Sequence, residues 1–365
     1  MSKAVLVMGG DGIGPEVIDQ AVRVLEAIAN ADGLNLNIEH RPYGLACYRD
    51  HGVLMSEETL ADLLEADGVL FGATGGPGYE QVPREVHMQS SLLRIRKEMD
   101  VFANLRPVRV PDALLDVSPL RAEVVRGTDL IFVRELTSGL YFGRPKTIEA
   151  LADGGERGID TQSYTTAEIE RVARAAFDLA GSRDRRVCSV DKSNVMESGR
   201  LWRRVVSEVA GDYPDITLTH LLGDNCGMQL VLAPTQFDVI LADNMFGDIL
   251  SDVAAATMGT LGTLPSASFS APGPDGRRRA FYEPVHGSAP DIAGQGAANP
   301  VAAILCVAML LRHSLERPDL GQRLEAAVDA ALAAGVRTRD ICPAGGQAVS
   351  TEDMAGAILA ELAKA

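Results

Sequence analysis

The sequence predicts an α/β protein with a central, largely parallel sheet. Short apolar or β-branched runs alternate with helical segments along nearly the whole chain, and parallel strands require such crossover helices. The chain has 365 residues, of which 46% are hydrophobic and 23% charged, a balance typical of globular proteins. A chain of this length can form two domains, or one large body with an insertion.

The pattern begins with a strand, a helix and a second strand. Residues 4–8 are an apolar run, and residues 15–30 are helical in pattern, with Pro15 in the first turn, where no helical amide partner is lost. Residues 69–71 are predicted to form a buried strand and residues 92–99 a helix. Further strands are expected at residues 101–106, 130–134, 187–190, 216–220 and 237–242. Further helices are expected at residues 165–180, 198–210, 225–232, 300–313, 320–334 and 351–362.

One helix start is marked by capping residues. Thr165 or Thr166 is expected to cap the helix that follows, because Glu168 lies in its first turn. The polar, Pro- and Gly-containing segments 109–128 and 143–165 flank an apolar run, and we expect them to form an excursion such as a protruding arm.

The overall charge excludes some classes of partner. A net charge of −16 argues against nucleic acid or an anionic membrane, because both reward basic patches. No apolar run approaches the roughly 20 residues needed to span a bilayer. The five cysteines are odd in number, widely spaced and without a Cys-x-x-Cys pair, which favours free thiols in a reducing cytoplasm.

Two carboxylates are spaced for one face of a helix. Asp248 and Asp252 follow an apolar run, and i, i+4 side chains point the same way. Two like charges so placed favour a hard divalent cation such as Mg²⁺ or Mn²⁺. The alternative is a solvated acidic helix face.

A glycine-rich turn follows the first strand. Residues 10–16 read Gly-Asp-Gly-Ile-Gly-Pro-Glu, but Pro15 stands where a dinucleotide fingerprint needs its third glycine. We therefore expect a tight turn that lines a pocket rather than a Rossmann nucleotide site.

Three arginines lie at the ends of expected elements. Arg96, Arg106 and Arg134 could converge as a local anion site in an acidic chain, because arginine binds carboxylates in a bidentate manner. The alternative is three surface salt bridges.

Two further segments could carry chemistry. Tyr141 and Lys192 could move protons near a metal if they meet in the fold, although each alone is more often structural. The segment 283–294 is dense in Gly, Pro and small residues, so its backbone could wrap adenosine, with Asp291 on the ribose hydroxyls. The alternative is a rigid loop bounded by prolines.

Taken together, these blocks resemble the decarboxylating β-hydroxyacid dehydrogenases, the isocitrate/isopropylmalate dehydrogenase family, over essentially the whole chain. The most specific blocks are residues 10–16, 102–107, 133–137 with 141–143, 189–192, 246–252 and 283–294. The Arg-Glu-Leu-Thr block with Tyr-Phe-Gly is similar to the isopropylmalate branch. That branch implies NAD-dependent oxidative decarboxylation of (2R,3S)-3-isopropylmalate to 4-methyl-2-oxopentanoate in leucine biosynthesis.

The resemblance implies roles for matching positions. Arg96, Arg106 and Arg134 would clamp the two carboxylates of a small dicarboxylate substrate. Lys192 would be the general base for the substrate hydroxyl, and Tyr141 would donate a proton to the enol carbon.

The resemblance also implies a shared metal site. Asp248 and Asp252 of one subunit would ligate Mg²⁺ or Mn²⁺, which would polarise the substrate hydroxyl. Asp224, which also borders the substrate, and Lys192 would come from the partner subunit. Sites shared in this way imply an obligate homodimer.

The cofactor and domain division follow from the same resemblance. The family fold is not a Rossmann domain, and it implies one α/β domain of residues 1–101 with 259–365 and a second of residues 102–258, which bears the dimer interface and the arm. Asp291 implies NAD rather than NADP, because a carboxylate repels a 2′-phosphate. Cofactor contacts are implied at Gly75, His286, Gly287, Ser288, Ala289, Asp291, Ile292 and Asn299.

One loop departs from the family pattern. Gln89 replaces a glutamate and Ser91 a glycine, whereas Leu92 and Leu93, the expected apolar wall for the isopropyl group, remain. A dehydrogenase of another 3-alkyl- or 3-arylmalate, or of tartrate or isocitrate, is therefore an alternative. A non-catalytic binding protein on this fold is a remote one, because the arginines, aspartates, lysine and tyrosine are all present.

Overall fold

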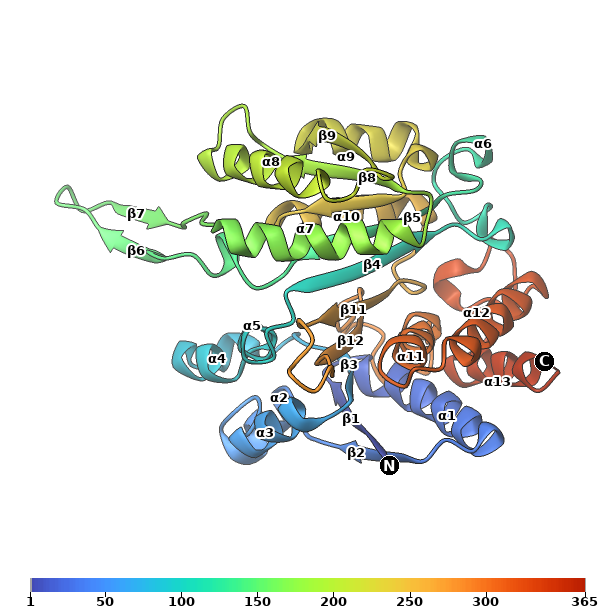
Figure 1. The fold of residues 1–365 in the computed structure, drawn as a ribbon. Coiled ribbons are helices and arrows are strands. Elements are labelled where there is room, and N and C mark those ends of the chain that lie inside the picture. Colours follow the sequence, from blue (N-terminus) through green and yellow to red (C-terminus); the bar gives the residue numbers. More distant parts are fainter. Residues whose placement is uncertain (1, 365) are drawn as a thin grey trace. The chain divides into compact units, whose positions relative to one another are not determined.

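The computed structural model describes residues 2–364, which form two compact units (Figure 1). Unit 1 contains residues 2–101, 110–127 and 258–364, and unit 2 contains residues 102–109 and 128–257. Each unit combines its own strands and helices, so the expected α/β class is confirmed. No helix among the described residues is long and apolar enough to cross a membrane.

The strands of unit 1 are mostly parallel. Only the last pair, which joins β11 to β12, is antiparallel. The strands lie in the order β2 (Leu36–His40), β1 (Lys3–Gly10), β3 (Gly68–Ala73), β12 (Ala280–Pro284) and β11 (Pro265–Phe269). All six residues of β3 are buried, as expected for an interior parallel strand covered on both faces.

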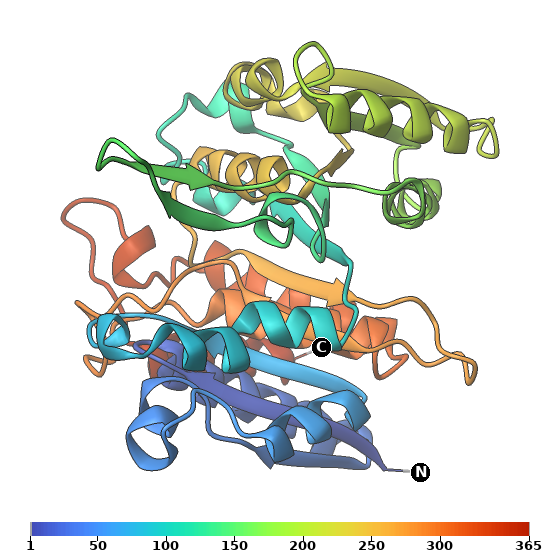
Figure 2. The same cartoon turned by 90° about the vertical axis from the view of Figure 1, so that its left-hand side faces the viewer.

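Besides the short helix α6 (Ala122–Val125), unit 1 contains two groups of helices. One group packs together beside the strands in Figure 1: α1 (Gly14–Asp32), α11 (Val301–His313), α12 (Pro318–Ala333) and α13 (Thr351–Leu362). The other group is α2 (Leu45–His51), α3 (Glu57–Glu65), α4 (Arg84–Ser90) and α5 (Leu92–Glu98), of which α4 and α5 lie on the side that faces the viewer in Figure 2.

Unit 2 repeats the same plan. Its strands lie in the order β4 (Ala103–Arg109), β5 (Asp129–Glu135), β10 (Val239–Ala242), β8 (Arg186–Asp191) and β9 (Thr217–Leu222). Within this order, only the β4–β5 pair is antiparallel. The helices are α7 (Thr166–Gly181), α8 (Glu197–Ala210), α9 (Gly223–Leu232) and α10 (Asn244–Met258).

The two polar segments of the expected excursion behave differently. Strands β6 (Thr147–Ala150) and β7 (Glu156–Ile159) form an antiparallel pair that extends beyond the rest of unit 2 as an arm (Figure 1). Residues 110–127, which the sequence-based division assigns to the second domain, pack in unit 1. Leu114 and Val125 are buried there, and the Arg337 guanidinium donates to the Ala113 carbonyl.

Local signals predicted helix starts well. Thr165 is the N-cap of α7, with a capping box in which its hydroxyl accepts from Glu168 N while the Glu168 carboxylate accepts from Thr165 N. Proline lies in the first turn of α1, as expected. The short elements β2, α2 and α3 and the β11–β12 pair were not anticipated.

Candidate active site

Helix α10 presents the two predicted aspartates of unit 2. The helix follows the buried strand β10, and its first turn is fixed by Asp243, whose carboxylate accepts from Phe246 N at 2.8 Å. Asp248 and Asp252 are one turn apart on this helix. Burial raises the pKa of Asp252, against an opposing effect of Arg106.

Two buried arginines reach these carboxylates. Arg106 on β4 places Nη2 3.2 Å from Asp248 Oδ1 and Nη1 3.7 Å from Asp252 Oδ1. Arg134 on β5, only 1% exposed, donates from Nη1 to Asp248 Oδ1. The structure thus brings together two of the three predicted arginines. A β-carbon at Gly247 would lie 2.6 Å from Arg134 Cγ, so glycine is what lets this side chain pass α10.

Tyr141 joins the same cluster. It ends the short turn η3 (Gly139–Tyr141), and its hydroxyl donates to Asp248 Oδ2 at 2.9 Å. The Arg134 guanidinium lies 5.6 Å from the centre of its ring. Burial, reinforced by the hydrogen bond to Asp248, raises the Tyr141 pKa, so the phenol stays protonated at neutral pH and can donate a proton.

Lys192 and Asp224 form a separate pair in unit 2. Lys192 follows β8 and Asp224 lies in the first turn of α9, with Nζ 2.6 Å from Oδ1. The hydrogen bond from Lys192 lowers the pKa of Asp224. Among residues 2–364, no group of three or more His, Cys, Asp or Glu side chains is arranged to hold a metal. One chain therefore does not assemble Asp224 with the α10 aspartates.

Arg96, the third predicted arginine, belongs to unit 1. It lies on α5, where its Nη2 donates to Glu283 Oε1 at 2.8 Å. Its Nε is buried and has no hydrogen-bond partner among the described residues. Leu92 begins the same helix, and Ser91, the departure from the family glycine, is its N-cap and accepts from Arg94 N.

The predicted cofactor segment of unit 1 is held by the glycine-rich turn. The Ser288 carbonyl accepts from Ile13 N at 2.8 Å, and a β-carbon at Gly12 would lie 1.9 Å from that oxygen. Further along, Ala298 N donates to Glu16 Oε1 at 3.1 Å. The turn therefore anchors both ends of a loop.

The predicted cofactor contacts in this segment differ in whether their polar atoms already have partners within the protein. His286 Nδ1 lies 2.9 Å from the Gly287 carbonyl, while its buried Nε2 has no partner among the described residues. Burial lowers the His286 pKa, which favours a neutral ring. Asn299 is used structurally, since its amide donates to Asp340 and accepts from Val301 N. The remaining predicted positions are partly buried Ala289 and Ile292 and exposed Asp291.

Asp11 is a residue that sequence reasoning missed. Its buried carboxylate accepts from Gly75 N at 3.2 Å, Leu45 N at 2.8 Å and the Tyr79 hydroxyl at 2.7 Å. It thereby fixes the loop that contains Gly75, a predicted cofactor contact. Its position inside the glycine-rich motif was the only signal in the sequence. Its role could not be predicted from that signal, because the three donors lie far along the chain.

Asn104 and Asn244 were missed as well. Both are buried and accept hydrogen bonds from Arg106 and Arg134, respectively. Their only sequence signal was a polar amide beside an apolar strand run.

Comparison with known proteins agrees with this geometry. The family model described as isocitrate/isopropylmalate dehydrogenase matches residues 4–358. The chain is 54% identical to the 3-isopropylmalate dehydrogenase of Ruegeria pomeroyi and 52% identical to that of Gluconobacter oxydans, over 98% of each chain. Among solved structures, isocitrate dehydrogenase from Methylococcus capsulatus matches with a TM-score of 0.83 and 32% identity, covering 99% of both chains. A β-decarboxylating dehydrogenase from Thermococcus kodakarensis matches with a TM-score of 0.79 and 38% identity, covering 99% of this chain and 96% of that one. This chain belongs to the isocitrate/isopropylmalate dehydrogenase family.

Proposed function

We propose that the protein oxidises (2R,3S)-3-isopropylmalate with NAD and decarboxylates the product to 4-methyl-2-oxopentanoate, a step of leucine biosynthesis. The relatives with this activity in their names, at about 50% identity over nearly the full chain, support the choice of substrate. The single observation that carries the chemistry is the cluster in which Arg106, Arg134 and Tyr141 meet Asp248.

The arginines suit a dianionic substrate. Arg106, Arg134 and Arg96 would bind its two carboxylates, and burial strengthens each such contact because water competes less. The unpartnered Nε of Arg96 offers one donor for this purpose. Leu92 would border the isopropyl group.

Proton movements fall to two residues. Lys192 would accept the proton of the substrate hydroxyl, while the carbon that bears this hydroxyl would give up a hydride to NAD. Loss of CO₂ from the neighbouring carbon leaves an enol, and Tyr141 would protonate its carbon. The raised pKa of Tyr141 supports that role, because a neutral phenol is the proton donor.

The donor set of α10 fits a divalent metal. Asp248 and Asp252 offer only carboxylate oxygens on one helix face, which suits Mg²⁺ or Mn²⁺. Burial already disfavours the charged form of Asp252, so a cation there would be stabilising. Asp224 would be a ligand from the partner. When bound, the metal would act as a Lewis acid on the substrate hydroxyl.

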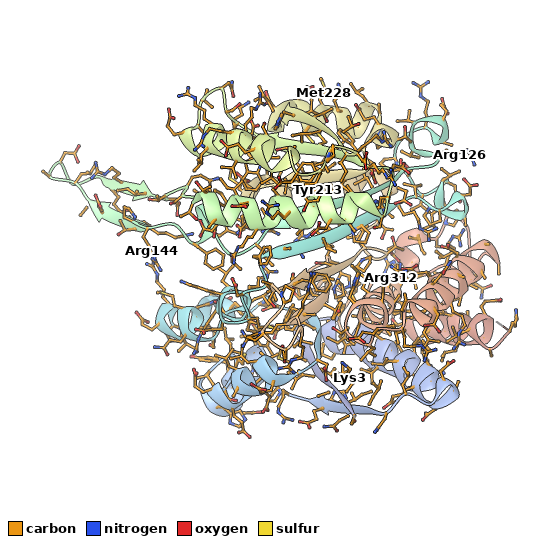
Figure 3. The ribbon with its side chains drawn as sticks, viewed as in Figure 1. Lys3, Arg126, Arg144, Tyr213, Met228 and Arg312 are labelled. Atoms are coloured by element: carbon orange, nitrogen blue, oxygen red, sulfur yellow. The ribbon has the colours of Figure 1, made fainter. Side chains whose placement is uncertain are left out.

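Sharing these ligands between two chains requires a homodimer. Exposed apolar side chains on α9 and α10 offer a surface for it: Met228, labelled in Figure 3, is 52% exposed, Leu232 61% and Ile249 55%. The cysteines are free thiols, which supports placing the reaction in the cytoplasm.

The cofactor would lie against the loop that the glycine-rich turn anchors. The unpartnered, neutral His286 Nε2 offers a hydrogen-bonding position. Exposed Asp291 would accept from ribose hydroxyls and repel a 2′-phosphate, which favours NAD. Gly75, Gly287, Ser288, Ala289, Ile292 and Asn299 complete the proposed contacts.

Steady-state kinetics test this proposal. Initial rates would be measured with isopropylmalate, other 3-alkyl- and 3-arylmalates, tartrate and isocitrate, each with NAD and with NADP. The highest kcat/KM is expected for isopropylmalate with NAD. The departures at Gln89 and Ser91 favour a second candidate, another 3-substituted malate, and a hundredfold preference for one would replace the first proposal.

A further inference from the structure

Each buried arginine of unit 2 is held by a side-chain amide. Arg134 donates from Nε and Nη2 to Asn244 Oδ1, at 3.1 Å and 2.7 Å. Arg106 donates from Nε to Asn104 Oδ1 at 3.0 Å. The two asparagines are 0% and 1% exposed, so neither amide faces bulk water.

Asn244 has no freedom to turn away. Its Nδ2 donates to the Ser138 carbonyl at 2.9 Å, which fixes Oδ1 as the atom that faces Arg134. Its backbone N donates to the buried Tyr164 hydroxyl at 2.9 Å. Asn104 lies on β4 directly opposite Arg134 on β5. The guanidinium planes are thus set by neighbours that are themselves fixed.

The amides are uncharged, and this matters for a dianionic ligand. The two guanidinium charges of Arg106 and Arg134 already face the two carboxylates of Asp248 and Asp252. A carboxylate in place of either amide would accept the same hydrogen bonds but leave the cluster with excess negative charge. It would then repel the substrate's carboxylates.

We propose that Asn244 and Asn104 are positioning residues that aim Arg134 and Arg106 at the substrate carboxylates without adding negative charge to the cluster. This inference rests on the proposed function, because it assigns the arginines to a dicarboxylate. It predicts that the asparagines affect substrate binding through the arginines.

A double-mutant cycle tests whether Asn244 acts by orienting Arg134. Asn244→Ala should lower kcat/KM about 10- to 100-fold, the effect of losing a hydrogen bond to a charged group, mainly through KM for the dicarboxylate. KM for NAD should change less than about twofold. In an Arg134→Lys background, which lacks the Nε–Nη2 edge, Asn244→Ala should cause little further loss. Additive losses in the cycle would overturn the inference.

Two aspartate variants test whether the neutral charge of the two amides matters. Asn244→Asp and Asn104→Asp should weaken dicarboxylate binding at least about tenfold while retaining a folded protein. The control is Thr257→Ala on α10, which removes a buried hydroxyl that donates to Ala254 O and should leave KM unchanged. Unchanged dicarboxylate binding in both aspartate variants would overturn the role of neutrality.

The readout separates this inference from the proposed function. Binding is measured as ligand-induced thermal stabilisation with malate and with the 3-substituted malate that the unmodified protein turns over fastest. Failure of the unmodified protein to turn over isopropylmalate counts against the substrate only. A dicarboxylate that stabilises the unmodified protein and the asparagine variants equally counts against the inference.

Discussion

Replacing Gly247 by alanine should displace the most buried arginine of the proposed active site. The new β-carbon would lie 2.6 Å from Arg134 Cγ and 2.8 Å from its Cβ. Carbon atoms pack at about 3.5 Å or more, so one side must move by about 1 Å. Arg134 is 1% exposed and bound to Asn244 and Asp248, so it has no solvent-facing space to enter.

Two opposing effects decide the outcome. Alanine in a helix interior gains about 1 kcal/mol over glycine, but overpacking a tight site costs about 1–3 kcal/mol. We therefore expect the free energy of unfolding to stay level or to fall by up to about 2 kcal/mol. An arginine misplaced by about 1 Å should lower kcat/KM on the order of 100-fold.

The assay compares two matched substitutions. Gly356→Ala in α13 meets no atom within 4 Å, so it should stabilise by about 0.5–1 kcal/mol without changing kinetics. Both variants would be measured by initial rates of NADH formation and by urea unfolding. The reasoning is refuted if Gly247→Ala matches Gly356→Ala in both measurements.

Four further predictions concern sharing, metal, cofactor and pH. Mixing Lys192→Ala and Asp248→Ala chains after unfolding should restore roughly a quarter of wild-type activity if sites are shared across random dimers; no recovery would place each site within one chain. Chelation with EDTA should abolish turnover, spare NAD binding measured by fluorescence, and be reversed by Mg²⁺ or Mn²⁺; full activity after exhaustive chelation would contradict a metal role. Asp291→Lys should shift the NADP-to-NAD ratio of kcat/KM at least about tenfold towards NADP, and an unchanged ratio would remove Asp291 from the cofactor site. Burial raises the pKa of Asp243 to about 6, above the value near 4 of an unfolded aspartate, so the native state binds this proton more tightly. Stability should therefore fall as pH rises from about 4 to about 6, and Asp243→Asn should flatten that slope in urea unfolding at each pH; an unaltered slope would assign it to other groups.

The sequence was sufficient where the signal is local. Proline in the first turn of α1 and the box between Thr165 and Glu168 act within a few residues, so the pattern alone located these helix starts. The spacing of Asp248 and Asp252 likewise placed both on one helix face.

Long-range partners could not be read in the same way. Asn244 and Arg134 are 110 residues apart, and no periodicity links them. Residues 110–127 pack in unit 1, where one of their carbonyls, that of Ala113, accepts a hydrogen bond from Arg337, far along the chain. Strands β11 and β12 flank a polar loop. Their pairing was not predicted, because the register depends on both strands together and not on the sequence of either one.

The Ser288 carbonyl has a consequence for how glycine motifs are interpreted. It occupies the start of α1, where it accepts from Ile13 N and approaches Gly12 more closely than any side chain would permit. In a dinucleotide-binding turn, the equivalent amides receive a pyrophosphate. Here the glycines admit the protein's own main chain, so a phosphate or sulfate ion should find this helix end already filled. Glycines in such a turn are therefore not in themselves evidence of a phosphate site, because here they accommodate a hydrogen bond within the protein's own main chain.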